Sequence, residues 1–142
     1  LWSGSCIVHE MFSERKIVGL KAQYPQALVL AHPECEEGVL RHADHVGSTS
    51  SILEFAKKTT AKDLIIATEP GLIHAMEKSI TGKRFIPAPP TNTCACNECP
   101  HMKRNTLEKL YLCLRDKRPA LEMEESLRVR ALAPITRMLE MS

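Results

Sequence analysis

The sequence predicts an α/β fold in which helices cover both faces of a small parallel sheet, a three-layer sandwich, with a helical extension at the C-terminal end. Two short segments, 28–31 and 64–67, contain only apolar residues, which is typical of strands buried on both faces of a parallel sheet. Segments with the apolar spacing of helices follow each of them. Because strands that alternate with helices form parallel sheets covered on both faces, these observations favour this fold class.

The elements of the first half follow from capping residues and apolar runs. Residues 1–8 are short and apolar, and fit either a strand end or a loop that enters a site. Ser13 is placed to cap a helix that Pro25 ends. After the first apolar strand we expect a brief helix at 36–41 and a short strand at 44–46.

The elements of the second half are punctuated by capping and turn residues. Ser51 and Glu54 form a capping-box pattern, which predicts that a helix starts there. The second apolar strand runs into 68–71, where the sequence predicts simple capping of another helix. Residues 84–86 then form a final short strand.

The last third of the chain combines a proline-rich loop, 87–102, with a helical tail, 105–142. The prolines in the loop favour extended backbone, because each fixes its own φ and restricts the residue before it. In the tail, Pro119 is expected to end a first helix, and a second amphipathic helix is expected to restart at Pro134.

Composition and charge argue against several classes of function. The net charge is +2 and aromatic residues make up only 4%, so neither electrostatic capture nor base stacking favours a nucleic-acid partner. No apolar run reaches the roughly 18 residues of a membrane span, and no export signal is evident. Six cysteines without such a signal indicate a cytoplasmic, reducing compartment, where clustered thiols more often bind metal than form disulfides.

Three cysteines lie close together in the proline-rich loop, at Cys94, Cys96 and Cys99, and His101 follows them. Such spacing is a poor way to build a core and a good way to hold a metal ion or an iron–sulfur cluster. One interpretation is therefore a non-catalytic zinc-binding α/β module that uses these four residues. A disulfide or a group of solvated thiols is the alternative without metal.

The remaining cysteines, Cys6, Cys35 and Cys113, are single and far apart in the sequence. This pattern suits a cluster whose thiolates are collected from distant parts of a fold. From their surroundings, Cys35 and Cys113 are expected to be buried structural thiols. Spacing alone does not distinguish Cys6 from a thiol of that kind.

Two further groups carry polar chemistry at predicted strand ends. His32, Pro33 and Glu34 follow the first strand, and alternate residues of extended chain point the same way, so the imidazole and the carboxylate can share a site for proton transfer. The alternative is a histidine bonded to the backbone and a glutamate that supports the next helix. Residues 47–51 offer hydroxyls and backbone N–H groups for an anion, or only a helix cap.

Five short motifs, taken together and in this order, resemble the quinolinate synthase family. The matching order spans most of the chain, and the combination is far more specific than any of its parts. The motifs are Gly4-Ser5-Cys6-Ile7-Val8-His9, His32-Pro33-Glu34-Cys35, Ala43-Asp44-His45-Val46-Gly47-Ser48-Thr49-Ser50, Ala67-Thr68-Glu69-Pro70-Gly71 and Cys99-Pro100-His101-Met102.

The resemblance implies an enzyme of de novo NAD biosynthesis. It would condense iminoaspartate, which aspartate oxidase supplies, with dihydroxyacetone phosphate to give quinolinate, phosphate and water. The family fold has three similar α/β domains around a pseudo-threefold axis. A [4Fe-4S] cluster lies where they meet, held by one cysteine from each domain, and its open iron acts as a Lewis acid.

Carried over by motif, Cys6 and Cys99 are expected to ligate the cluster. Glu34 is the candidate for proton transfer, and His32 would bind or polarise a substrate oxygen. Together with Pro33 these two residues would line the substrate site. Ser48 and Thr49 would hold a substrate carboxylate or phosphate.

The chain also departs from the family pattern. Residues 1–12 are expected to be the end of a preceding domain that carries a cluster cysteine, and residues 13–142 to be the C-terminal α/β domain. The family's first domain, with the third cluster cysteine, is absent, so we expect this chain alone to assemble no stable cluster and to be inactive. The shortened cysteine spacing leaves a Cys94–Cys99 or a Cys96–Cys99 disulfide open.

Overall fold

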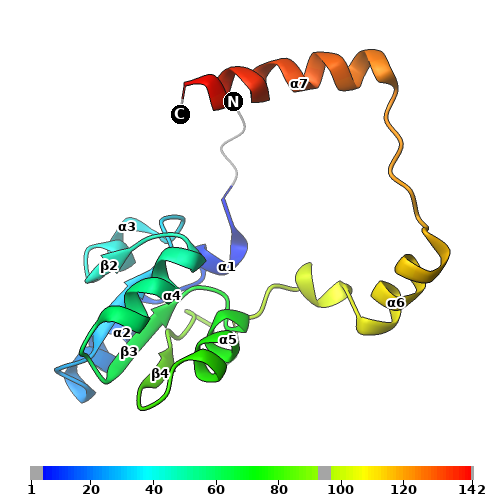
Figure 1. The fold of residues 1–142 in the computed structure, drawn as a ribbon. Helices are drawn as coiled ribbons and strands as arrows, with labels where there is room; N and C mark the ends of the chain where they lie inside the picture. The colour runs from blue at the N-terminus through cyan, green and yellow to red at the C-terminus, as the bar shows by residue number, and fades with distance from the viewer. Residues whose placement is uncertain (1–4, 93–96, 142) are drawn as a thin grey trace. The chain divides into compact units, whose positions relative to one another are not determined.

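The computed structural model describes residues 5–92 and 97–141 (Figure 1). The chain divides into a sheet unit, residues 1–103, and a tail unit, residues 104–142. The sheet unit contains every strand of the described residues, and the tail unit is helical. This composition confirms the predicted α/β class with a helical C-terminal extension.

A four-stranded parallel sheet forms the centre of the sheet unit, with the strand order β2-β1-β3-β4. The central pair, β1 and β3, is in register from Leu28 opposite Leu64 to Ala31 opposite Ala67. Apart from Asp63 at the start of β3, both strands are apolar, as expected for strands covered on both faces. The strands are β1 (Leu28–Ala31), β2 (His45–Val46), β3 (Asp63–Ala67) and β4 (Arg84–Pro87).

Helices cover both faces of this sheet, which confirms the three layers. On one face the first three helices contribute Val8, Ile17 and Val39 to a buried cluster. On the other face the next two contribute residues such as Ile52 and Met76. The helices are α1 (Ile7–Glu10), α2 (Glu14–Gln23), α3 (Glu37–Leu40), α4 (Thr49–Lys58) and α5 (Gly71–Ser79).

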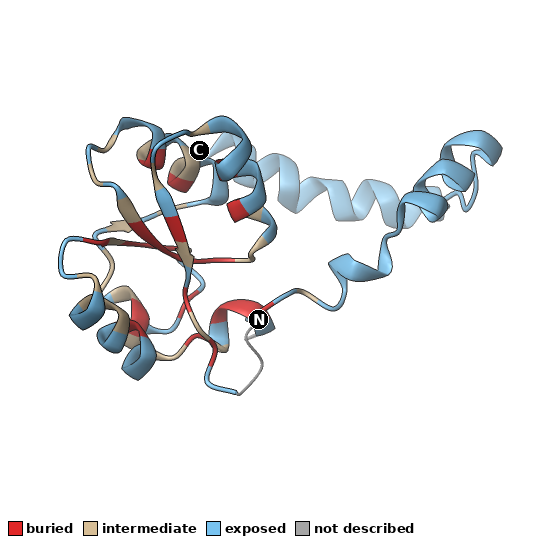
Figure 2. Cartoon of the chain, turned by 90° about the horizontal axis from the view of Figure 1, so that it is seen from below, coloured by how far each residue is buried: buried red, intermediate tan, exposed pale blue. Residues whose placement is uncertain are grey.

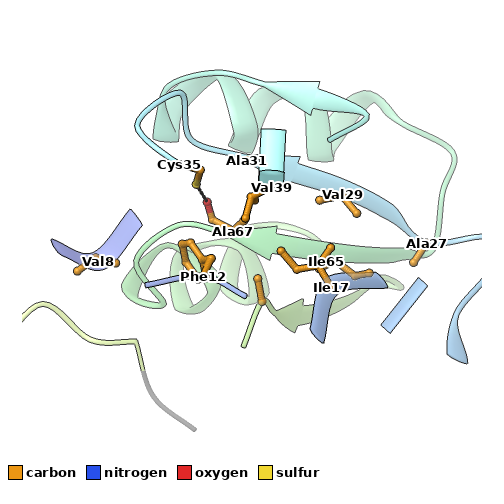
Figure 3. Close-up of a cluster of buried hydrophobic side chains, with 11 residues drawn as sticks. Val8, Phe12, Ile17, Ala27, Val29, Ala31, Cys35, Val39, Ile65 and Ala67 are labelled. Atoms are coloured by element: carbon orange, nitrogen blue, oxygen red, sulfur yellow. Dashed lines mark hydrogen bonds between the residues drawn. The ribbon is translucent and has the colours of Figure 1, made fainter. Parts of the chain in front are cut away.

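The first of these clusters lies under the candidate site. Figure 3 shows Ile17 of α2 beside Ile65 of β3, and Phe12 beside Ala67. Val8 and Phe12 therefore pack on the core of this sheet unit. Residues 7–10 form a helix, where a strand end or a loop was expected. The assignment of residues 1–12 to a preceding domain stays a prediction.

The capping-box prediction at Ser51 is wrong by three residues. Ser48 is the N-cap of α4, and its hydroxyl accepts the N–H of Ser51 at 3.3 Å. The Ser51 hydroxyl instead lies 3.0 Å from Nε2 of His45. Glu54 pairs with Lys57 at 2.7 Å, so it does not return to the helix start. The capping-box pattern therefore placed the start of this helix about one helical turn too far along the chain.

The tail unit contains α6 (Leu107–Asp116) and α7 (Glu125–Glu140), and the short 3-10 helix η1 (Met102–Arg104) precedes them. The N-cap of α6 is Thr106. None of the described residues from 104 to 141 is buried, and Figure 2 shows α6 and α7 exposed along their length. Both helices are amphipathic, and their apolar faces are open to solvent within this unit.

The expected helix restart at Pro134 is wrong, because α7 begins at Glu125 and continues through this proline. Glu124 caps the helix, since its carboxylate accepts the N–H groups of Ser126 and Leu127 at 2.9 and 3.0 Å. A proline inside a helix removes one backbone hydrogen bond. Leu132 and Ala133, which precede it, are good helix formers, and the helix continues despite that loss. Among the described residues, no helix is both long and apolar enough to cross a membrane.

Candidate active site

The candidate site lies at the carboxyl edge of the sheet, where β1 and β3 end side by side. His32 follows Ala31, and Thr68 follows Ala67, the register partner of Ala31. The N–H of His32 donates to the carbonyl of Ala67 at 3.1 Å, which fixes the two strand ends together. Ligand sites in parallel α/β sheets form at this edge.

His9 of α1 is the centre of the polar contacts at this edge. His9 is 7% exposed, and its ring stacks on the ring of His32 with a centroid distance of 4.2 Å and an interplanar angle of 10°. Nδ1 lies 3.1 Å from Oε2 of Glu34, and Nε2 lies 3.1 Å from Oγ1 of Thr68. Residues from α1 and from the ends of β1 and β3 thus meet on one imidazole.

Burial, and next the charge of His32, lowers the pKa of His9, although the Glu34 carboxylate acts in the opposite direction. A lowered histidine pKa means that the ring is neutral at neutral pH. A neutral His9 beside the ionised Glu34 holds the carboxylate by a hydrogen bond without neutralising its charge.

The Glu34 carboxylate is the most accessible part of this arrangement. Its side chain is 55% exposed, although His9 contacts Oε2 and Nδ1 of His32 lies 3.7 Å from the same oxygen. The backbone N–H of Glu34 donates to Nδ1 of His32 at 3.3 Å, so Nε2 carries the proton of a neutral His32 ring. The site therefore presents a carboxylate that accepts protons and an imidazole N–H that donates one.

The thiols near this edge differ in their surroundings. Cys35 is buried and its Sγ donates to the carbonyl of Ala67 at 3.4 Å, as Figure 3 shows. Burial raises the pKa of Cys35 to about 11, so it stays a thiol at neutral pH. The prediction that Cys35 is a buried structural thiol is confirmed. The same prediction for Cys113 is wrong, since Cys113 is exposed on α6.

Cys6, His9 and Glu34 each offer one atom to a common point, and these three atoms lie within 4.8 Å of one another. This is the only such group among the described residues, and Cys99 does not join it. Cys99 is partly buried and packs against the same core cluster as Cys6. The loop that carries Cys99 is tied to α1, because Nδ2 of Asn97 donates to the carbonyl of Val8 at 2.5 Å.

Part of the predicted cysteine group falls outside the described residues. Cys94 and Cys96 lie there, so the compact zinc site and the two disulfides of this loop stay predictions. Within the described part, Sγ of Cys99 accepts the N–H of Met102 at 3.5 Å, and His101 is exposed.

Ser48 and Thr49 lie at the same edge of the sheet. The N–H of Gly47 donates to the carbonyl of Ala31 at 3.1 Å, which brings the start of α4 to the end of β1. The turn is tight, because a Cβ on Gly47 would lie 2.6 Å from Oγ of Ser51. No hydrogen bond joins Ser48 or Thr49 to Glu34 among the described residues, and the Ser48 hydroxyl serves as the α4 cap.

Sequence reasoning missed two residues that the fold brings to the centre. His9 follows Cys6 by one helical turn, a spacing that places both on one side of α1. Thr68 was expected only to cap a helix, but it is 3% exposed and bonds to His9. Thr68 directly follows β3, just as His32 directly follows β1. This equivalent position at the end of a strand could have identified Thr68 as a site residue.

The fold and the site together define an α/β protein with a histidine–carboxylate pair and a nearby thiol at the carboxyl edge of a parallel sheet. A profile of the family described as "Quinolinate synthetase A protein" matches residues 1–140. The chain therefore belongs to the quinolinate synthase family, and the resemblance drawn from its motifs is confirmed.

Curated relatives agree with this assignment. The chain is 63% identical over 142 residues to a quinolinate synthase of Microcystis aeruginosa. It is 60% identical over 142 residues to the one of Rippkaea orientalis, and 59% identical over 143 residues to the one of Thermosynechococcus vestitus. Each comparison covers the whole chain, but only 44% or 45% of the relative. The chain thus spans less than half the length of these relatives.

Proposed function

We propose that this chain is the C-terminal portion of a cytoplasmic quinolinate synthase, one part of an enzyme built from three similar α/β domains. The complete enzyme condenses iminoaspartate with dihydroxyacetone phosphate to give quinolinate, phosphate and water. Family membership supports the reaction. The observation that carries the role of this portion is the accessible Glu34 carboxylate, which His9 holds by a hydrogen bond beside the ring of His32.

The condensation requires protons to be removed from carbon and added to leaving hydroxyl groups. Glu34 is suited to these transfers, because one of its oxygens is oriented by His9 and the side chain remains half exposed. His32 donates a hydrogen bond from Nε2 to a substrate oxygen. Pro33 stiffens the turn between them, and Ser48 and Thr49 bind a carboxylate or phosphate at the start of α4.

The family also implies a [4Fe-4S] cluster, and the residues present fit it in part. Thiolates are the donors such clusters require, and Cys6 and Cys99 are both partly buried against one core cluster. These two residues would hold the cluster together with a cysteine of a domain that this chain does not contain. When bound, the cluster supplies Lewis acidity at its open iron.

The proposal also names a functional partner. Iminoaspartate hydrolyses readily in water, so an enzyme that consumes it depends on a nearby source. Aspartate oxidase, which produces iminoaspartate, is that source in this proposal.

The central test is the substitution Glu34→Gln in the full-length enzyme. Loss of a proton-transfer group lowers turnover by about 10² to 10⁴-fold. Glu36→Gln is the matched control, because Glu36 lies two residues away, is exposed and makes no side-chain cap of α3. Quinolinate formation is measured with both substrates supplied. Equal turnover in the Glu34→Gln and Glu36→Gln enzymes would contradict the role of Glu34.

The 142-residue chain gives a second test. Because it carries only Cys6 and Cys99 of the expected ligands, we expect no stable cluster after anaerobic reconstitution with iron and sulfide, and no quinolinate. The measurements are visible absorption, iron and acid-labile sulfide. A stable cluster on the isolated chain would overturn this expectation, and one bound zinc without sulfide would favour the zinc-binding module.

A further inference from the structure

We infer that Thr68 is a positioning residue: its hydroxyl donates to Nε2 of His9, fixes the ring with its proton on Nδ1, and so aims that N–H at Glu34. The inference goes beyond the proposed function, because it assigns a role to a residue outside the motif that carries the proton. Only the expected effect of Thr68 on catalysis rests on the proposed function.

The direction of each hydrogen bond follows from the chemistry of the partners. An ionised carboxylate only accepts, so the contact of 3.1 Å between Nδ1 of His9 and Oε2 of Glu34 requires a proton on Nδ1. In a neutral imidazole the other nitrogen then carries a lone pair. The hydroxyl of Thr68, 3.1 Å from Nε2, is therefore the donor of the second bond. The tautomer of one ring is set from both of its sides.

The hydroxyl is well placed to enforce this choice. Thr68 is 3% exposed, and the residue before it ends the central strand β3. The carbonyl of Ala67 receives both the N–H of His32 and the thiol of Cys35, which holds the backbone at this point. Because threonine is β-branched, its rotamers are few and the hydroxyl direction is defined.

Two consequences follow for the site. With both nitrogens of His9 engaged, this ring is unavailable as a metal ligand in the arrangement seen, which leaves Cys6 as the soft donor of its group. With Oε2 of Glu34 held by His9, the exposed carboxylate keeps Oε1 for a substrate proton. A second residue that orients a ligand or a base in this way is worth about 10-fold to 100-fold in activity.

The variant that tests the inference must remove the hydroxyl and keep the volume. A cavity of about 120 Å³ borders Thr68, with Phe12 and Asn97 in its wall. A smaller side chain at position 68 would admit water, which can replace the lost donor. Thr68→Val is therefore the disruptive variant, and Thr68→Ser, which restores a hydroxyl, is its matched control.

The first measurement is the tautomer of His9 in the 142-residue chain, read from long-range ¹H–¹⁵N NMR correlations of the ring. We expect the proton on Nδ1 in the wild type and in Thr68→Ser, and a mixture of tautomers in Thr68→Val. A wild-type ring protonated on Nε2, or an unchanged tautomer in a folded Thr68→Val chain, overturns the inference. If Thr68→Val does not fold, a wild-type ring that carries its proton on Nε2 still overturns the inference.

The second measurement is steady-state kinetics in the full-length enzyme. Thr68→Val is expected to lower kcat at least tenfold with little change in KM, and Thr68→Ser to restore most of it. A fall in kcat that Thr68→Ser shares equally would contradict the role of the hydroxyl.

The two proposals fail separately. If Glu34→Gln leaves turnover intact while the tautomer behaves as expected, the proton-transfer role of Glu34 fails and the positioning by Thr68 stands. If Glu34→Gln abolishes turnover but the His9 tautomer is unchanged in Thr68→Val, only the positioning role of Thr68 fails.

Discussion

Helices α4 and α6 are closely matched in sequence character and differ in what they bury. Each has ten residues and an amphipathic pattern, and each begins with a hydroxyl that accepts the N–H three residues on, from Ser48 and Thr106 respectively. Yet α4 buries Ile52 and Ala56 completely against the sheet, whereas α6 buries no residue among those described. The local signals for a helix are equal, and only the partner surface differs.

The difference shows what amphipathicity does and does not determine. An apolar stripe at helical spacing predicts a helix and identifies the face it will bury. It does not supply the surface that covers this face, and an isolated helix of ten residues is only marginally stable in water. In the sheet unit that surface is the sheet itself, so α4 is stabilised mainly by packing. Helix α6 depends on its cap and on local side-chain pairs within its unit.

The largest expected effect comes from shortening an apolar side chain in each helix. Ile52→Ala should lower the free energy of unfolding of the sheet unit by about 2 to 5 kcal/mol, because it removes buried methylenes and leaves a cavity. Leu110→Ala on α6, where the side chain is 55% exposed, should change it by less than about 0.5 kcal/mol. Urea unfolding followed by circular dichroism measures both values.

Equal losses of unfolding free energy in Ile52→Ala and Leu110→Ala would contradict the difference in burial between α4 and α6. A large loss for Leu110→Ala in particular would show that α6 packs on the sheet unit in solution.

A smaller effect is expected from removing the two caps. Ser48→Ala should lower the free energy of unfolding of the sheet unit by about 1 kcal/mol, since it leaves the N–H of Ser51 without its acceptor. Thr106→Ala removes the matching bond to Lys109. Because α6 has no buried face, this change should reduce local helix content and leave the unfolding of the sheet unit unchanged. Hydrogen exchange of the amides in each helix separates the two outcomes.

The smallest effect is a pH dependence confined to the sheet unit. The pKa of His9 is lowered by burial first and by His32 next, whereas a histidine in the unfolded chain has a pKa of about 6.5. Below that pH the unfolded chain binds more protons than the folded one, so the free energy of unfolding falls as the pH falls. The stabilisation that depends on neutral His9 is fully present above about pH 6.5, and it is lost as the pH falls toward the pKa of His9 in the folded chain.

The variant that checks this pH dependence is His9→Gln, which should flatten the slope between about pH 7.5 and 5.5. His74→Gln, on the exposed side of α5, should keep the slope of the wild type. The tail unit contains no histidine, so its helix content should not change over this range. A slope that survives His9→Gln would assign the effect to another group.

Much of the fold could be predicted because its signals are local. The strands at β1 and β3 are read directly from apolar runs, and the helix after Ser13 from its cap, which accepts the N–H of Lys16. The errors occurred where two local readings competed. Ser51 looked like a helix cap, but its hydroxyl contacts His45 instead. Pro134 looked like a helix start, but it lies inside the longer helix α7.

The candidate site was predicted in its motifs and not in its arrangement. His32 and Glu34 could be named from their motif, but the extended backbone expected between them is wrong, because residues 33–34 form a turn. Their connection to His9 spans 25 positions in the sequence, and the bond from His9 to Thr68 spans 59. Helix and strand periodicities relate only residues a few positions apart. The sequence therefore did not indicate that His9 and Thr68 would be paired.

The sequence by itself determined the α/β class, most element positions, the family and the polar motifs, because these depend on residue type and spacing along the chain. Tertiary structure alone decided that α1 folds onto the strand ends, that His9 bonds to both Glu34 and Thr68, and that α4 is covered while α6 is exposed. The physical reason is that hydrogen-bond direction and burial depend on which surfaces meet in space.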